Sequence, residues 1–149
     1  MQTTLNNLHM KQTMQLRILR QEPVVERDQA GNPKYAIVVP CYNEEKRLPF
    51  QQFLSFAREH SEVILCFVND GSRDNTLEVL RNLQKQCPEN ICVYNLPQNG
   101  GKSEAVRQGM LFVYNNYSVT MLGFLDADLA TLPEEWLEMA KYKETRPQY

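Results

Sequence analysis

Residues 63–76 read Val-Ile-Leu-Cys-Phe-Val-Asn-Asp-Gly-Ser-Arg-Asp-Asn-Thr. The continuous apolar run at the start of this stretch is typical of a strand that is buried on both faces. The polar residues that follow, with Gly71 among them, predict a turn. Leu77, Leu80 and Leu83 then recur at helical spacing. The stretch therefore predicts a strand, a turn and a helix, the unit from which parallel sheets are built.

The same alternation continues along the chain. Further apolar, strand-like runs lie at residues 35–39, 91–96 and 119–125, and helical spacing recurs at residues 50–57 and 106–117 and again from about residue 132. Strands joined by helical crossovers run parallel and are covered on both faces. The sequence therefore predicts an α/β fold with a doubly wound, mostly parallel sheet, similar to a Rossmann fold.

The predicted helices carry recognisable start and stop signals. Asn75 with Glu78, and Thr131 with Glu134, have the spacing of a capping box, in which side chains satisfy the free N–H groups of the first turn. The Cys87-Pro88 pair should end the helix that covers Leu77 to Leu83.

The chain has room for one domain. Its 149 residues, 42% of them hydrophobic, can bury one core of ordinary size. Residues 1–33 are expected to be an extension, helical or disordered, that ends in a linker. Residues 34–149 are expected to form the ligand-binding domain.

Composition excludes several classes of function. The 16 basic and 18 acidic residues nearly cancel, which argues against a nucleic-acid partner. The four cysteines have no metal-ligand spacing and are expected to be reduced. Residues 1–30 lack the apolar block of a signal peptide, and no apolar run reaches the ~18 residues of a transmembrane segment. We expect a cytoplasmic protein and leave open a place at the cytosolic face of a membrane.

Each predicted strand ends in a polar, turn-rich cluster. These clusters lie at residues 40–45, 69–74, 97–102 and 126–128. The carboxyl ends of parallel strands share one edge of a sheet, and open α/β sheets bind ligands at that edge. The clusters therefore predict a single ligand site.

Asp126 and Asp128 are separated by one residue at the end of the last apolar run. In an extended backbone such residues point to the same side. Mg²⁺ or Mn²⁺ takes one or two protein carboxylates and completes its shell with water and phosphate oxygens. The alternative is a solvated turn whose aspartates cap the next helix. The neighbouring polar clusters favour the metal site.

Other candidate ligands lie in the remaining clusters. Asp70 could accept hydrogen bonds from a ribose or a base, or it could bond its own turn. Tyr42 could offer a flat face to a base, or it could be a rim residue. Gly100 and Lys102, at a helix start that favours phosphate, are candidate diphosphate partners together with Arg107.

Two common nucleotide motifs are absent from the sequence. A P-loop would need a glycine at position 96, where Leu96 stands, and the loop after the first strand has no Gly-x-Gly-x-x-Gly. The site is therefore neither a P-loop nor a dinucleotide-binding loop of a dehydrogenase.

With these clusters identified, residues 35–136 resemble the N-terminal part of family 2 glycosyltransferases of the GT-A fold. The matching strings lie at residues 38–45, 68–76, 99–109 and 124–129. The resemblance implies that Pro40, Tyr42 and Glu44 line a nucleoside pocket and that Asp70 contacts the base or ribose. It also implies that Asp126 and Asp128 form the Asp-x-Asp (DXD) motif, which binds the sugar nucleotide and the metal.

Within that family the chain is most similar to the dolichyl-phosphate or polyprenyl-phosphate hexosyltransferases. The resemblance implies transfer with inversion from a nucleoside-diphosphate sugar, of the UDP-glucose or GDP-mannose type, to a lipid-phosphate or saccharide acceptor. Ala130, where the mannosyl branch usually has glutamine, favours UDP-glucose.

The family pattern continues into a second half that this sequence does not show. The acceptor site, the catalytic carboxylate and a Gln-x-x-Arg-Trp motif are missing, and Trp136 is the single tryptophan. We therefore expect a truncated fold, a catalytic base outside this chain, and self-association through uncovered faces. The alternatives are a non-catalytic, nucleotide-sugar-binding half-domain and an aspartate-nucleophile phosphotransferase, which Ala130 disfavours.

Overall fold

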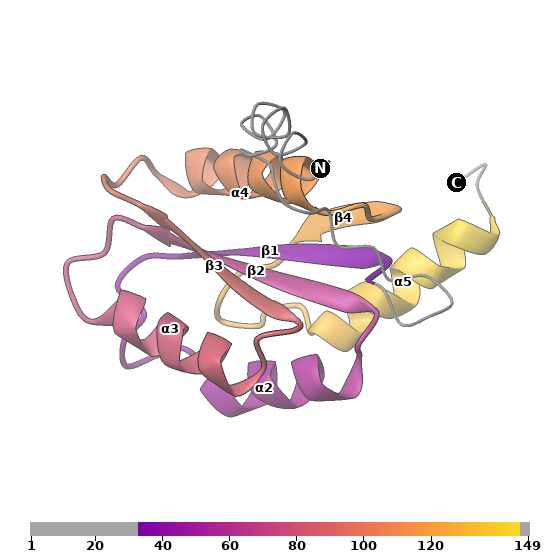
Figure 1. Ribbon diagram of the computed structural model, residues 1–149, viewed down its shortest axis with the longest axis horizontal. Coiled ribbons are helices and arrows are strands. Elements are labelled where there is room, and N and C mark those ends of the chain that lie inside the picture. The colour runs from indigo at the N-terminus through magenta and orange to yellow at the C-terminus, as the bar shows by residue number, and fades with distance from the viewer. Residues whose placement is uncertain (1–32, 147–149) are drawn as a thin grey trace, which may run out of the picture.

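The computed structural model describes residues 33–146, which form a parallel sheet of four strands in the order β3-β2-β1-β4 (Figure 1). The strands are β1 (Tyr35–Cys41), β2 (Val63–Asp70), β3 (Ile91–Leu96) and β4 (Met121–Phe124). The helices are α2 (Phe50–Glu59), α3 (Thr76–Gln86), α4 (Lys102–Asn116) and α5 (Pro133–Thr145). The predicted N-terminal helix and most of the predicted linker lie outside the described residues.

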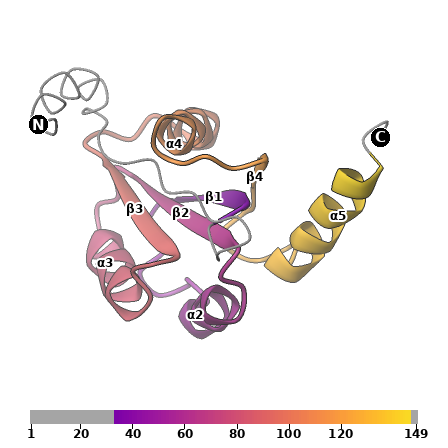
Figure 2. The same cartoon turned by 45° about the vertical axis from the view of Figure 1, so that its right-hand side comes forward.

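Helices cover both faces of the sheet, as the doubly wound prediction requires. α4 lies over one face, and α2 and α3 lie over the other (Figures 1 and 2). Alternate residues of each strand feed two separate apolar clusters. Ile37 and Phe67 belong to the cluster that includes α2, α3 and α5, whereas Val38 and Val68 pack with Ala105 and Val113 of α4. Among the residues described, no helix is long and apolar enough to cross a membrane.

Gly109 allows α4 to lie close to the sheet. A Cβ atom at this position would stand 2.6 Å from Val38 Cγ1 and 2.6 Å from Val68 Cγ2, well inside van der Waals contact. The helix therefore rests directly on β1 and β2, and its N-terminus is held at the carboxyl edge of the sheet.

α5 docks on the side of the sheet where β4 lies (Figure 2). Trp136 packs edge-on against the ring of Tyr35, with ring centroids 6.4 Å apart, and covers Gly123. The Tyr35 hydroxyl donates a hydrogen bond to Glu144, near the end of the helix. Burial, followed by this carboxylate, raises the pKa of Tyr35 well above its usual value. The hydroxyl therefore remains a proton donor over the whole neutral range.

The predicted strand over residues 119–125 is longer than the observed β4. β4 pairs with β1 only as far as Phe124 opposite Val38, and Leu125 donates one more hydrogen bond, to the Val38 carbonyl. The next bond of a parallel ladder would come from the N–H of residue 40. Pro40 has no N–H, so the ladder ends there and the chain turns away.

Both predicted capping boxes are wrong in detail. The Asn75 side chain does not cap α3; its Nδ2 group donates instead to Glu45, a residue of another loop. At α5, Pro133 occupies the first helical turn, and the carboxylate of Glu135, not Glu134, accepts the N–H of Leu132. Pro133 sets the helix start, which moves the capping pair by one residue.

Candidate functional site

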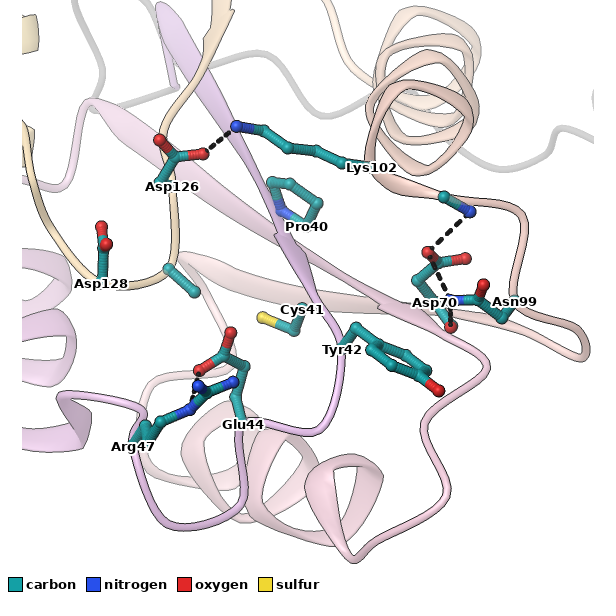
Figure 3. A pocket seen from close by; sticks show the side chains of 12 residues that line it. Pro40, Cys41, Tyr42, Glu44, Arg47, Asp70, Asn99, Lys102, Asp126 and Asp128 are labelled. Atoms are coloured by element: carbon teal, nitrogen blue, oxygen red, sulfur yellow. Dashed lines mark hydrogen bonds and ion pairs between the residues drawn. The ribbon is translucent and has the colours of Figure 1, made fainter.

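A cavity of about 550 Å³ lies at the carboxyl edge of the sheet, where the sequence predicts a ligand site (Figure 3). Its walls come from the ends of β1, β2 and β4 and from the start of α4. The lining residues are Pro40, Cys41, Tyr42, Glu44, Arg47, Asp70, Asn99, Gly101, Lys102, Asp126, Ala127 and Asp128.

The structure brings together most of the residues proposed from sequence. The predicted residues that line the cavity are Pro40, Tyr42, Glu44, Asp70, Lys102, Asp126 and Asp128. Gly100 is not among the lining residues, and Arg107 pairs with Glu104 on α4. Sequence reasoning missed Arg47 and Asn99. Arg47 could have been identified as a cation three residues after Glu44. Asn99 could have been identified as an amide directly before Gly100 and Gly101.

The loop that carries Tyr42 and Glu44 is bonded to the loop after β2. Asn43 donates its N–H to Ser72 Oγ at 2.9 Å, and its own Oδ1 accepts the N–H of Arg73 at 2.8 Å. The N–H of Glu44 donates to Thr76 Oγ1 at 2.8 Å. Asn43 has a φ of 54°, a left-handed conformation that asparagine tolerates. These bonds fix the backbone on which Tyr42 faces the cavity.

Asp74 anchors the same contact. Although partial burial opposes ionisation, hydrogen bonds from the hydroxyl and N–H of Thr76 lower the pKa of the Asp74 carboxyl, and the N–H of Glu45 contributes as well. The carboxylate is therefore ionised at neutral pH and joins both loops.

Glu44 and Arg47 form an ion pair on the wall beside Tyr42. Arg47 Nε lies 3.4 Å from Glu44 Oε1, and its Nη2 donates to the Asn43 carbonyl at 3.2 Å. The Arg47 side chain is 69% exposed and that of Glu44 19%. Arg47 therefore presents a cation to the cavity mouth above a carboxylate that is largely covered.

Cys41 lies in the cavity wall but is chemically inert. Burial, followed by the charge of Glu44, raises the pKa of the Cys41 thiol far above its usual value. Its sulfur donates to the Val39 carbonyl at 3.6 Å. Because the thiolate is the reactive form, burial of this thiol makes Cys41 a poor nucleophile at neutral pH.

Asp70 ties the end of β2 to the loop before α4. Its carboxylate accepts the N–H of Gly100 at 2.8 Å and the N–H of Gly101 at 3.1 Å. It also accepts a hydrogen bond from Asn99 Nδ2 at 3.0 Å (Figure 3). The residue is only 2% exposed. A carboxylate has about four acceptor positions, so one remains for a ligand that reaches it from the cavity.

Asp126 and Asp128 do not share an extended segment, contrary to the expectation from their spacing. The backbone turns at residues 127–128, and Leu129 has a φ of 60°. Asp128 Oδ1 accepts the N–H of Ala130 at 2.9 Å, which closes the turn. Both carboxylates still line the cavity, but they reach it from different points of the turn (Figure 3).

Lys102 approaches Asp126 from the opposite wall. Its ammonium group forms an ion pair with Asp126 Oδ1 (Figure 3). The same ammonium group lies 5.6 Å from the centre of the Phe124 ring. Lys102 is the first residue of α4, so the pair bridges the start of this helix and the end of β4.

The donor atoms suit a divalent cation that is shared with a ligand. Within residues 33–146 no group of three or more His, Cys, Asp or Glu residues could hold a metal by itself. Asp126 and Asp128 nevertheless offer hard oxygen donors in one cavity. Mg²⁺ or Mn²⁺ is commonly held by one or two carboxylates plus phosphate oxygens, and this arrangement fits that pattern.

Known proteins resemble this chain in sequence and in fold. The profile of the family described as "Glycosyl transferase family 2" matches residues 36–148. A dolichyl-phosphate beta-glucosyltransferase of Trichomonas vaginalis is 39% identical over 114 residues, which cover 71% of this chain and 34% of that protein. The chain thus spans about a third of the length of the curated relatives it matches.

Solved structures show the same fold. The S. aureus TarS fragment 1–349 in complex with UDP aligns with a TM-score of 0.60 at 21% identity, covering 75% of this chain and 32% of that one. A mannosyltransferase of Pyrobaculum calidifontis in complex with GDP-Man and Mn²⁺ aligns with a TM-score of 0.54 at 18% identity, covering 81% of this chain and 34% of that one. The sheet and its helices are those of the GT-A glycosyltransferases.

Proposed function

Because this chain belongs to glycosyl transferase family 2, we propose that its cavity binds the nucleoside diphosphate of a sugar donor. We further propose that the complete protein transfers the hexose, with inversion, to a polyprenyl or dolichyl phosphate. The observation that carries the proposal is the meeting of an aromatic ring, a buried carboxylate, a lysine and the Asp-x-Asp pair in one cavity.

The nucleoside is proposed to occupy the part of the cavity between Tyr42 and Asp70. Tyr42 is 39% exposed and offers a ring face for stacking. Asp70 retains an acceptor position for an N–H of the base or a hydroxyl of the ribose. Pro40 and Glu44 complete this wall, and Arg47 lies at its mouth.

The diphosphate is proposed to lie between Lys102 and the Asp126–Asp128 turn. Lys102 supplies a cation, and the start of α4 favours an anion. The N–H of Gly100 already donates to Asp70. The role of Gly100 as a phosphate ligand therefore remains a prediction. Asp126 and Asp128 would hold Mg²⁺ or Mn²⁺, which when bound offsets the charge that develops on the leaving diphosphate.

The lipid-phosphate acceptor is proposed because several relatives are dolichyl-phosphate beta-glucosyltransferases. A lipid phosphate is ionised at neutral pH and can attack the anomeric carbon without a general base. Attack from the face opposite the diphosphate would invert the configuration. UDP-glucose is the donor that Ala130 favours, and the lipid acceptor would place the reaction at the cytosolic face of a membrane.

Binding and transfer can be tested separately on the full chain. Calorimetric titration with UDP and GDP, with and without MnCl₂, should show binding that depends on the cation. Transfer of label from UDP-glucose or GDP-mannose to polyprenyl phosphate tests the reaction. Failure to bind either nucleotide with Mn²⁺ would show that the donor site is wrong. Binding without transfer is the result expected of these residues alone, because the acceptor site and the catalytic base are expected outside them. Only a complete protein that binds without transfer would favour the alternative, a non-catalytic half-domain.

A further inference from the structure

The ammonium group of Lys102 occupies a position from which a metal ion would approach Asp126. It is in direct contact with Asp126 Oδ1, and the Phe124 ring flanks it at 5.6 Å. Phe124 is 44% exposed, and the Lys102 ammonium group lies over its ring. One carboxylate oxygen of the Asp-x-Asp pair is therefore already neutralised by a residue of the chain.

The backbone of Lys102 is fixed, so only its side chain can move. The two N–H groups that precede it, of Gly100 and Gly101, both donate to Asp70. Gly109, two turns further along α4, holds the helix against Val38 and Val68. A change in the position of the Lys102 charge must therefore come from rotation about its own side-chain bonds.

The ion pair is exposed and can be exchanged. The side chains of Lys102 and Asp126 are 57% and 45% exposed. Exposed pairs of this kind are weak, because water solvates both charges well. A divalent cation carries twice the charge of an ammonium group and competes effectively for the same oxygen. The displaced ammonium then lies next to the space proposed for the diphosphate.

We propose that Lys102 is an exchangeable counter-ion, which neutralises Asp126 in the free protein and moves to the diphosphate when the metal and nucleotide bind. The inference rests on the donor site proposed above. The exchange has a thermodynamic consequence. A metal ion that binds alone displaces Lys102 from Asp126 and leaves the ammonium group without a new partner. When nucleotide binds as well, its diphosphate becomes that partner. Metal and nucleotide should therefore bind with positive cooperativity, each strengthening the other.

The test measures Mn²⁺ binding without nucleotide, by the electron paramagnetic resonance signal of free Mn²⁺. Lys102→Met keeps the length and apolar stem of the side chain and removes the charge. We expect this variant to bind Mn²⁺ about two- to fivefold more tightly than the wild type, the range of an exposed ion pair. The same variant should bind UDP more weakly in the presence of Mn²⁺, so the two affinities change in opposite directions.

Two controls separate exchange from a general charge effect. Arg107→Met removes a cation from the same helix, where it pairs with Glu104 and does not line the cavity, and should leave Mn²⁺ affinity unchanged. In an Asp126→Asn background, Lys102→Met should give no gain, because the carboxylate that Lys102 neutralises is gone. Lys102→Arg should behave as the wild type does.

Unchanged or weaker Mn²⁺ binding by Lys102→Met would overturn the exchange, as would an equal gain in the Asp126→Asn background. Neither result bears on the donor site itself, which is tested by binding of UDP or GDP to the wild type with Mn²⁺. Thermal unfolding of each variant checks that the fold is intact.

Discussion

The carboxylate of Asp70 and the N–H of Gly100 form a 2.8 Å hydrogen bond that joins the end of β2 to the loop before α4. With the bonds from Gly101 and Asn99, this residue holds a loop 29 to 31 residues further along the chain. The N–H groups of Gly100 and Gly101, which could otherwise attract an anionic ligand, thus already donate to a carboxylate of the protein. Asp70 has a structural role in addition to its proposed contact with the nucleoside.

Asp70→Ala should therefore reduce stability as well as nucleotide affinity. The substitution leaves two N–H groups and an amide without their acceptor, and such a loss costs about 1 to 3 kcal/mol of unfolding free energy. Urea unfolding measures the first effect and UDP titration with Mn²⁺ the second. Glu138→Ala, at an exposed position of α5, is the control. Unchanged stability would mean that water replaces the lost acceptor.

Asp128→Asn should abolish the dependence of nucleotide binding on Mn²⁺ without unfolding the turn. Asparagine keeps the Oδ1 atom that accepts the N–H of Ala130, so we expect a change in stability within about 0.5 kcal/mol. The measurement is the thermal shift with UDP, with and without Mn²⁺. Glu138→Gln makes the same chemical change away from the cavity. A metal-dependent shift that persists in Asp128→Asn would exclude this carboxylate from the site.

Gly109→Ala should destabilise the domain by about 1 to 3 kcal/mol. The added methyl group would overlap Val38 and Val68, at 2.6 Å from each, and would push α4 away from the sheet. Asn115→Ala, on the exposed side of the same helix, is the matched control, expected within about 0.5 kcal/mol of the wild type. Urea unfolding distinguishes the two, and equal stabilities would show that the helix shifts at no cost.

Tyr35→Phe should cost about 1 kcal/mol at neutral pH, the contribution of its hydrogen bond to Glu144. The bond from Tyr35, followed by the charge of Lys34, lowers the pKa of the Glu144 carboxyl. A lowered pKa gives stability that is present above the unfolded value of about 4.3 and is lost as pH falls through the folded value.

The difference between wild type and Tyr35→Phe should therefore shrink below about pH 4. Urea unfolding at neutral pH and at acid pH measures it in both proteins. Tyr114→Phe, at a site that is 77% exposed, should show no difference at either pH. A Tyr35→Phe difference that is the same at both pH values would contradict the role of Glu144.

Local patterns were sufficient to predict the sheet and the edge at which the candidate cavity lies. The apolar run at residues 63–68 and the polar residues after it predict β2, and the alternation with helices predicts that the loops share one edge. Contacts between distant residues were not predictable in this way. The end of β4 depends on Pro40, which lies in another strand. The side chain of Asn75 donates to Glu45 in another loop and does not cap its own helix.

The Asp126–Asp128 turn shows a second limit. The extended geometry assumed for this pair fails because the backbone turns at residues 127–128. Leu129, directly after the turn, has a φ of 60°, a left-handed conformation that leucine rarely takes and that no local signal indicates. Asp70 shows a third, because its spacing before Gly71 suggests a local turn residue, whereas its partners lie in the loop before α4.

The paired loops at residues 43–45 and 72–76 bear on how members of this family can be recombined. Each loop supplies side-chain acceptors for backbone donors of the other, from Ser72 to Asn43 and from Asn43 to Arg73. A chimera that takes one loop from a relative would inherit donors whose acceptors remain in the parent sequence. Exchange of both loops as one cassette keeps the bonds between them internal to the graft, so the two loops should be exchanged together.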